Sequence, residues 1–309
     1  MPEEPITAQE PRRCGFIAIL GAPNVGKSTL LNRLVGTKVS IVTSKVQTTR
    51  RRVLGITIEG AAQLVFVDTP GIFQPRPGRR LELAMVRAAW RSAEDADQRI
   101  LVVDAKRGLD ADTRLVLEGL RERGERAIMA VNKLDLVRPP TLLPLIRRFD
   151  ETGLFDRVFI VSARDGDGCD DLLDALAEGL PEGPWLFPED QLSDLSQRAM
   201  AAELTREQLF AKLHQELPYS LTVETEGWVA SHDGAEVRID QTIYVQRASQ
   251  KAIVLGKGGQ QIKAVGEAAR RELEGMLQQR VHLFLFVKVR RNWLEDPERY
   301  QELGLEFPA

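Results

Sequence analysis

The sequence predicts an α/β fold with a mostly parallel sheet in the first half of the chain and a smaller α+β fold in the second. Three observations support this. Apolar runs alternate with amphipathic stretches as far as Leu180, a proline- and glycine-rich segment follows, and two alternating runs then meet at Asp233-Gly234. The chain has 309 residues. One domain takes roughly 100–200 residues, so two domains are expected.

Short apolar runs in the first half are expected to be strands, and most of them are too uniformly apolar to have a face in water. They are residues 15–20, 53–58, 64–71, 99–105, 127–133 and 158–163. Helix-like stretches separate them at residues 81–95, 109–123, 140–150 and 169–179. Buried strands with intervening helices predict a parallel sheet covered on both sides. The second and third strands are too close in sequence for a crossover, so they should form an antiparallel hairpin at one edge.

The second half has a different pattern. A helix is expected over residues 192–216, and the Asp-Gly turn should join strands over 220–231 and 235–246. A helix, a Gly-Lys-Gly-Gly loop, a second helix, a strand over 281–290 and a short helix over 294–303 complete the pattern. We therefore expect a mobile tail over 1–14, a first domain over 15–180, a linker over 181–191 and a second domain with a C-terminal tail over 192–309.

Composition limits the functional class. The two cysteines, Cys14 and Cys169, lie far apart without metal-ligand spacing, which favours a reducing compartment. No apolar run is long enough to span a membrane, and the polar N-terminus has no signal core, so we expect a cytoplasmic protein. The net charge is −3, yet residues 247–291 carry ten Lys and Arg against three Glu. This basic island suggests a contact with a polyanion, although a mixed solvated face is an alternative.

A phosphate-binding loop occupies residues 21–28, between an apolar strand and a helical stretch, and matches G-x-x-x-x-G-K-[ST]. Its glycines let backbone N–H groups surround phosphate oxygens at the positive end of a helix. Lys27 should reach the β- and γ-phosphates, and the Ser28 hydroxyl should bind Mg²⁺. Asp68 follows an apolar strand and should hold the same ion through water, while Gly71 should offer its N–H to the γ-phosphate.

A base-binding site is predicted by Asn132, Lys133, Leu134 and Asp135 after one strand and by Ser162-Ala163 after another. The Asp135 carboxylate can accept two parallel hydrogen bonds from guanine, and adenine has no matching pair of donors. The Lys133 stem should cover the base, and Asn132 should tie the loops together.

This ordered series of motifs resembles the G domain of translation-factor-related GTPases over residues 15–180. The resemblance implies that a threonine of the first switch, residues 42–50, completes the Mg²⁺ shell. Thr49 is the expected residue, with Thr48 as the alternative. Where Ras-like enzymes have a glutamine that orients water, this chain has Ile72, so catalysis should rest on positioning and charge stabilisation. Asn24 is a candidate partner of a potassium ion, or a residue that caps a turn.

The predicted sites contain the following residues. The catalytic set is Lys27, Thr49, Asp68 and Gly71, and the metal set is Ser28, Thr49 and Asp68 for Mg²⁺, with Asn24 for K⁺. The GTP or GDP set is Gly21, Ala22, Pro23, Asn24, Val25, Gly26, Lys27, Ser28, Thr29, Asp68, Thr69, Pro70, Gly71, Ile72, Asn132, Lys133, Leu134, Asp135, Ser162 and Ala163.

The glycine-rich segment at 256–259 is a GxxG loop between helices at the centre of the basic island. The element order around it resembles a KH domain of the second topological type, which implies RNA binding. A KH-like fold used only for protein contacts is the alternative. The expected RNA-binding residues are Leu255, Gly256, Lys257, Gly258, Gly259, Gln260, Ile262, Lys263, Arg290 and Arg291.

A G domain followed by this KH domain resembles the Era family of bacterial ribosome-assembly GTPases over nearly the whole chain. The resemblance implies GTP-dependent binding near the 3′ end of small-subunit ribosomal RNA, a monomer, and peripheral association with the cytoplasmic face of the inner membrane. A signalling switch that acts on a protein or membrane effector is the main alternative. A GTPase coupled to RNA modification is disfavoured, since no cysteine nucleophile or second cofactor loop accompanies the G domain.

Overall fold

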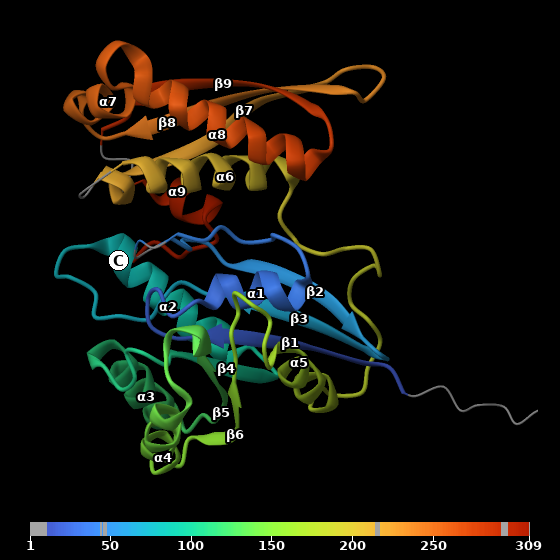
Figure 1. Ribbon diagram of the computed structural model, residues 1–309. Coiled ribbons are helices and arrows are strands. Elements are labelled where there is room, and N and C mark those ends of the chain that lie inside the picture. Colours follow the sequence, from blue (N-terminus) through green and yellow to red (C-terminus); the bar gives the residue numbers. More distant parts are fainter. Residues whose placement is uncertain (1–10, 44, 46–47, 214–216, 292–295, 309) are drawn as a thin grey trace, which may run out of the picture.

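The computed structural model describes residues 11–43, 45, 48–213, 217–291 and 296–308, and it divides them between two sheets (Figure 1). The larger sheet has the order β2-β3-β1-β4-β5-β6. Its strands are β1 (Arg13–Leu20), β2 (Val53–Glu59), β3 (Ala62–Asp68), β4 (Gln98–Asp104), β5 (Ala127–Asn132) and β6 (Phe155–Ile160). Only β2 runs antiparallel to its neighbour, which confirms the predicted edge hairpin.

Helices cover both faces of this sheet, as expected for strands without a wet face. They are α1 (Lys27–Val35), α2 (Arg80–Glu94), α3 (Ala111–Arg123), α4 (Leu142–Asp150) and α5 (Cys169–Glu178). One apolar core joins α1 and α5 to the sheet, and a second joins α2, α3 and α4 to the opposite face. Short 3-10 turns at Leu134–Leu136 and Pro139–Thr141 follow β5.

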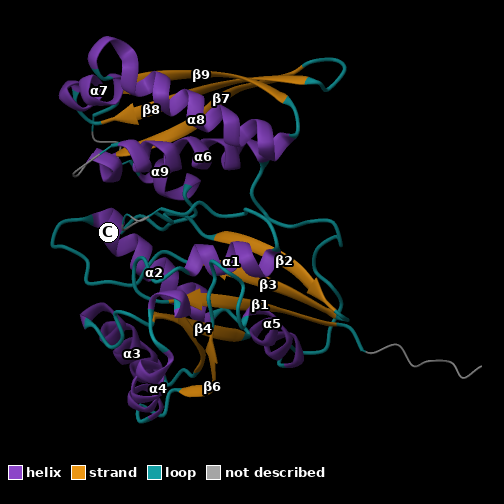
Figure 2. Cartoon of the chain, in the orientation of Figure 1, coloured by secondary structure: helices purple, strands orange, loops and turns teal. Residues whose placement is uncertain are grey.

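The smaller sheet has the order β7-β8-β9, with β7 (Leu221–Ala230) antiparallel to β8 (Glu236–Val245) and β9 (Arg280–Val289) parallel to β8. Its helices are α6 (Gln197–Lys212), α7 (Ala248–Leu255) and α8 (Gln260–Leu277), with 3-10 turns at Leu217–Ser220 and Lys257–Gly259. This is the predicted α+β arrangement of a type II KH fold. Figure 2 shows α6 between this sheet and the first half of the chain.

Some element bounds differ from those predicted. β1 begins at Arg13, so two residues of the expected 1–14 tail belong to the sheet. The helix expected over 192–216 is shorter, because the Ser196 side chain accepts a hydrogen bond from the Ala199 N–H and begins α6 at Gln197. The last helix is α9 (Pro297–Glu302). Parts of the tail (1–10), the first switch (44, 46–47), the expected long helix (214–216) and the expected last helix (294–295) lie outside the described residues.

Two segments tie the halves together. The proline-rich segment runs along the β2–β3 hairpin, where the Trp185 indole N–H donates to the Ala61 carbonyl at 3.0 Å and the Gln63 side chain accepts from the Phe187 N–H at 3.0 Å. The C-terminal end returns to α2, where Tyr300 and Leu305 join Leu81, Ala84 and Met85 in a small apolar cluster. No described helix is long and apolar enough to cross a membrane.

Candidate nucleotide site and nucleic-acid interface

The phosphate-binding loop joins β1 to α1, and its backbone requires glycine at its last turn. Gly26 has φ 100°, and a Cβ there would lie 2.3 Å from the Asn132 amide nitrogen. Any side chain at this position would push Asn132 away from the loop. The helix that follows begins with N–H groups directed at the loop, so the loop is built for an anion.

Lys27 lies under this loop and is almost fully buried. Its ammonium group donates to the Gly21 carbonyl at 3.1 Å and the Ala22 carbonyl at 2.9 Å. Burial lowers the pKa of Lys27 to about 8, and nearby Asp68 opposes that shift. The cation is therefore held beside the loop with little water around it, where a phosphate group would stabilise its charge.

Asp68 ends β3 and collects three hydroxyl groups around one carboxylate oxygen. Its Oδ2 accepts from Ser28 Oγ at 2.7 Å, from Ser40 Oγ at 2.8 Å and from Thr49 Oγ1 at 3.4 Å. Ser28 Oγ and Thr49 Oγ1 are 3.0 Å apart. The structure thus brings the three predicted metal residues together, and it adds Ser40, which the sequence motifs did not indicate.

The second oxygen of Asp68 fits a hydrated Mg²⁺. Asp68 Oδ1 is buried and has no hydrogen-bonding partner among the described residues. Burial raises the pKa of the Asp68 carboxyl, and its hydrogen bonds from Ser28 and Ser40 oppose the shift. A hard cation bound through water would both satisfy this oxygen and favour the ionised carboxylate.

Thr48, the alternative switch threonine, faces away from this cluster. Its Oγ1 is 2.6 Å from Thr43 Oγ1 and donates to the Lys45 carbonyl at 2.7 Å. Of the two threonines, the structure places only Thr49 beside Asp68.

Asn132 and Lys133, at the end of β5, join the base-side loops to the phosphate-binding loop. The Asn132 amide donates to the Val25 carbonyl at 2.9 Å, and its oxygen accepts from the Ala163 N–H at 3.0 Å. The Lys133 ammonium donates to the Asn24 carbonyl at 2.7 Å and to Asp104 Oδ2 at 2.7 Å. These contacts hold three loops at one edge of the sheet.

Asp135 has both carboxylate oxygens engaged at this edge. Oδ1 accepts from Ser162 Oγ at 3.0 Å, and Oδ2 lies 3.1 Å from a guanidinium nitrogen of Arg164. Arg164 is largely exposed, whereas Asp135 is not. Arg164 directly follows the predicted Ser162-Ala163 pair but belongs to no sequence motif.

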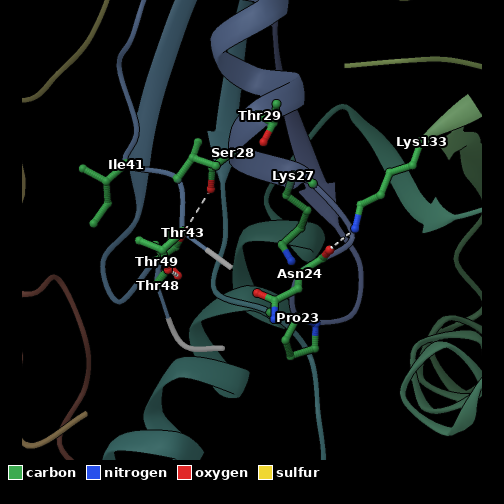
Figure 3. Close-up of a pocket in the computed structure, with 13 residues that line it drawn as sticks. Pro23, Asn24, Lys27, Ser28, Thr29, Ile41, Thr43, Thr48, Thr49 and Lys133 are labelled. Carbon is green, nitrogen blue, oxygen red and sulfur yellow. Dashed lines mark hydrogen bonds between the residues drawn. The ribbon is translucent and has the colours of Figure 1, made fainter. Parts of the chain in front are cut away.

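A cavity of about 360 Å³ lies between the phosphate-binding loop and the first switch (Figure 3). Its walls are Pro23, Asn24, Gly26, Lys27, Ser28, Thr29, Ile41, Val42, Thr43, Thr48, Thr49, Gly71 and Lys133. Three predicted residues, Ala22, Val25 and Ile72, are not among these walls, and their side chains are buried in the core. Ile72 is 1% exposed and its N–H donates to the Gly21 carbonyl at 3.1 Å, so its side chain has no access to a water at the phosphates.

The GxxG loop forms an exposed turn between α7 and α8. Gly258 and Gly259 have φ values of 60° and 77°, and a Cβ on either would meet no atom within 4 Å. An approaching backbone would therefore meet no steric obstacle at this turn. Leu255 packs against the core under the loop, and Gln260 begins α8.

A groove of about 420 Å³ runs beside this loop between α8 and β9. Ile262 and Lys263, both predicted, line it together with Gly266, Glu267, Arg270, Leu283 and Leu285. Arg290 and Arg291 do not line this groove; Arg290 pairs with Asp296 at 2.9 Å. Arg270 belongs to no sequence motif, because it lies about three helical turns beyond Gly259 on α8.

Comparisons with known proteins agree with this geometry. Residues 16–133 match the family model described as 50S ribosome-binding GTPase, and residues 216–294 match the KH domain. GTPase Era of Rhizobium meliloti is 57% identical over 96% of this chain and 94% of its own length. GTPase Era of Mesorhizobium japonicum is 58% identical over 98% of this chain and 97% of its own.

Solved structures show the same two-part fold. A crystal structure of a point variant of Aquifex aeolicus Era bound to GDP and AlF₄⁻ has a TM-score of 0.89 at 38% identity and covers 94% of this chain and 99% of its own. An Era structure in complex with MgGDPNP and nucleotides 1506–1542 of 16S ribosomal RNA has the same TM-score and covers 95% of this chain and 99% of its own. With nearly full-length identity above one half, a phosphate-binding loop beside a buried Asp68 and a KH fold behind it, the chain belongs to the Era family of GTPases.

Proposed function

We propose that this GTPase is a switch that binds the 3′ region of small-subunit ribosomal RNA when GTP is bound, and that it acts in assembly of the small ribosomal subunit. The observation that carries the proposal is the open GxxG turn beside the groove lined by Lys263 and Arg270. Such a turn lets a phosphate backbone approach closely, and the cations neutralise it. The related Era structure holds nucleotides 1506–1542 of 16S ribosomal RNA, which supports this choice of RNA.

Separate groups of residues in the nucleotide site would hold the phosphates, the base and Mg²⁺. Lys27 and the loop backbone would hold the β- and γ-phosphates, and Asp135 would hold guanine. Ser28, Thr49 and Asp68 would bind Mg²⁺, which neutralises charge on the phosphate oxygens. Displacement of Arg164 from Asp135 by guanine would free the carboxylate for the base. The buried Ile72 supports hydrolysis by charge stabilisation and positioning rather than by a side chain that orients water.

Three finer assignments belong to the same proposal. Asn24, which lines the cavity beside Lys27, would bind a potassium ion near the phosphates. Faster turnover in potassium than in sodium salts, lost on Asn24→Ala, would establish that role. We also propose that the protein acts as a monomer in the cytoplasm and associates peripherally with the inner membrane, as the family resemblance implies.

The test of RNA binding uses the double variant Lys257→Asp/Gly258→Asp. Both positions are exposed, and aspartate is one of the residues that best tolerates a φ of 60° like that of Gly258, so the variant should fold. It places carboxylates where RNA phosphates would approach. We expect affinity for an RNA of the 1506–1542 sequence to fall by about tenfold or more, while affinity for GTP stays unchanged.

The matched control is Arg271→Asp/Gly275→Asp, which makes the same change in net charge on exposed positions of α8 outside the groove. This control should lose only the RNA affinity that comes from long-range attraction between charges. Added salt screens that attraction, so the two variants are compared at high salt. Near-equal RNA affinity of the two variants would reject the GxxG loop as the RNA site. A sharp RNA-independent loss of GTP affinity would instead reject the separation of the two sites.

A further inference from the structure

Residues 38–42, at and just before the start of the first switch, lie between the nucleotide cavity and helix α6 of the KH half. Ile41 lines the cavity on one side and packs with Met200, Leu204 and other residues of the second half on the other. The Val42 N–H donates to Glu207 Oε1 at 2.8 Å, and the Lys38 ammonium lies 2.5 Å from Glu207 Oε2. This segment therefore contacts both halves of the chain.

Thr49 is the point where this arrangement reaches the predicted metal site. Its hydroxyl lies 3.0 Å from Ser28 Oγ and 3.4 Å from Asp68 Oδ2. The residues on either side of it are anchored in the KH half. Arg206 of α6 donates to the Thr48 carbonyl at 2.6 Å.

Arg50, on the other side of Thr49, reaches into the KH half itself. It donates to the Leu221 carbonyl at 2.7 Å and to the Pro218 carbonyl at 2.9 Å. Leu221 is the first residue of β7, so the anchor is part of the KH sheet. Thr49 thus lies on a short backbone span held at both ends by the second half of the chain.

The contact between the two halves buries two guanidinium groups, and removing these charges from water costs free energy. Arg50 and Arg206 are each 2% exposed, and both lie beside the Phe210 ring, at 5.6 and 5.2 Å from its centroid. Arg50 Nε and Arg206 Nη1 are buried without hydrogen-bonding partners in the described part of the chain. Glu203, at 3.1 Å from Arg206 Nε, is a carboxylate that offsets this charge. Apolar residues would join the halves with less desolvation, so directional hydrogen bonds to the switch backbone are what the arginines add.

We propose that Arg206, with Arg50, is a positioning residue for GTP hydrolysis: it holds the backbone around Thr49 so that the Thr49 hydroxyl faces Asp68. The KH half thereby completes the metal site of the G half in cis. This inference rests on the proposed role of Thr49. Because Thr49 is expected to contribute to the metal site when GTP is bound, loss of Arg206 should weaken the binding of GTP more than the binding of GDP.

The test compares Arg206→Met with Arg198→Met in the full-length chain. Arg198 is also on α6 and donates to two backbone carbonyls, of Thr225 and Glu226, but these lie within the KH half. We expect Arg206→Met to lower kcat about tenfold, since it removes one charge-assisted hydrogen bond. It should also raise the Mg²⁺ concentration for half-maximal turnover, weaken the GTP analogue more than GDP, and accelerate amide exchange at residues 48–50. Arg198→Met should change none of these.

Arg206→Lys guards against a folding defect, because it keeps the positive charge beside Glu203 without the planar fork. It should retain the melting temperature of the parent chain and still show the selective loss for GTP. Equal losses for GTP and GDP in both Arg206 variants would overturn the proposal.

Thr49→Ala separates this inference from the proposed role of Thr49. If Thr49→Ala leaves turnover and the Mg²⁺ requirement unchanged, the metal role of Thr49 is wrong and the inference falls with it. If Thr49→Ala lowers turnover but Arg206→Met does not, only the inference is wrong. The double variant Thr49→Ala/Arg206→Met should turn over GTP no more slowly than Thr49→Ala alone. Fully additive losses of turnover would show that Arg206 acts elsewhere.

Discussion

Lys27 shows at the scale of a residue how the site is prepared for its ligand. An ammonium group under the phosphate-binding loop is shielded from water and relies on two carbonyl oxygens. Burial lowers its pKa to about 8, whereas an unfolded chain would have a value of about 10.4. Between these values the unfolded chain binds more protons, so Lys27 makes the nucleotide-free protein more stable as pH rises from about 8 to about 10.

Nucleotide binding should reverse this shift. Phosphate oxygens favour the charged ammonium, so GDP binding at about pH 8.5 should take up a fraction of a proton, and binding at about pH 6.5 should take up none. Calorimetry in two buffers of different ionisation enthalpy measures the uptake. Lys27→Arg is the control, because a guanidinium stays charged at both pH values. Proton uptake of the same size in that variant would assign the effect to another group.

Sequence patterns predicted most, but not all, of the groups in the nucleotide site. Motifs place Ser28 in the first turn of the helix that follows β1 and Asp68 at the end of β3, and their meeting follows from the parallel pairing of these two strands. Ser40 and Arg164 lie outside any motif, and their contacts with Asp68 and Asp135 depend on loop conformations that local sequence does not encode. Likewise, nothing in the sequence alone indicated that Arg206 would meet the carbonyl of Thr48, 158 residues away.

Strand and helix identities could be predicted, because the strands of the first half are short apolar runs and the helices have a clear apolar period. Boundaries were less predictable, since caps decide them: Ser196 starts α6 later than its composition suggests. The packing of α2 against α3 could not be predicted from the sequence either. Gly119 of α3 leaves space for the Trp90 indole of α2, and a Cβ there would lie 2.2 Å from the ring.

Gly119→Ala should therefore destabilise the protein in spite of alanine's better helix propensity. Overpacking typically costs about 1–3 kcal/mol, more than the roughly 1 kcal/mol gained from propensity. The control is Gly275→Ala on α8, where a Cβ would meet no atom within 4 Å. That variant should be slightly more stable than the parent. Chemical denaturation of both measures the difference, and stabilisation by Gly119→Ala would show that Trp90 can move aside without loss.

The C-terminal segment of the chain packs against a helix of the first half. The C-terminal segment leaves the KH half and packs on α2, the helix that follows Asp68 and Gly71. Tyr300 is 1% exposed there, and its ring meets Phe307 edge-on at 4.9 Å between centroids. The C-terminal segment and the contacts of Ile41, Val42 and Arg50 therefore connect the KH half to the elements around the phosphates at two separate places.

Tyr300→Ala should release the C-terminal segment from α2. Truncation of a buried aromatic side chain costs about 3–5 kcal/mol, more than a short segment can recover from its remaining contacts. Amide exchange should accelerate in α2 and in residues 303–308 but not in α3. Arg91→Ala is the control: it removes only a solvent-screened ion pair with Glu306 and should leave the exchange unchanged. Unaltered protection of α2 in the Tyr300 variant would contradict this account of the contact.

The contacts of Ile41 and Arg50 with the second half also constrain how such a chain can evolve. A G half cut free of its partner would expose Ile41 and leave the Arg50 guanidinium without the carbonyls of Pro218 and Leu221. A different second half joined by recombination would have to supply an apolar contact and two acceptors at the same places. We therefore expect Ile41, Arg50, Leu204 and Arg206 to change together between lineages, and the two halves to be inherited as one unit.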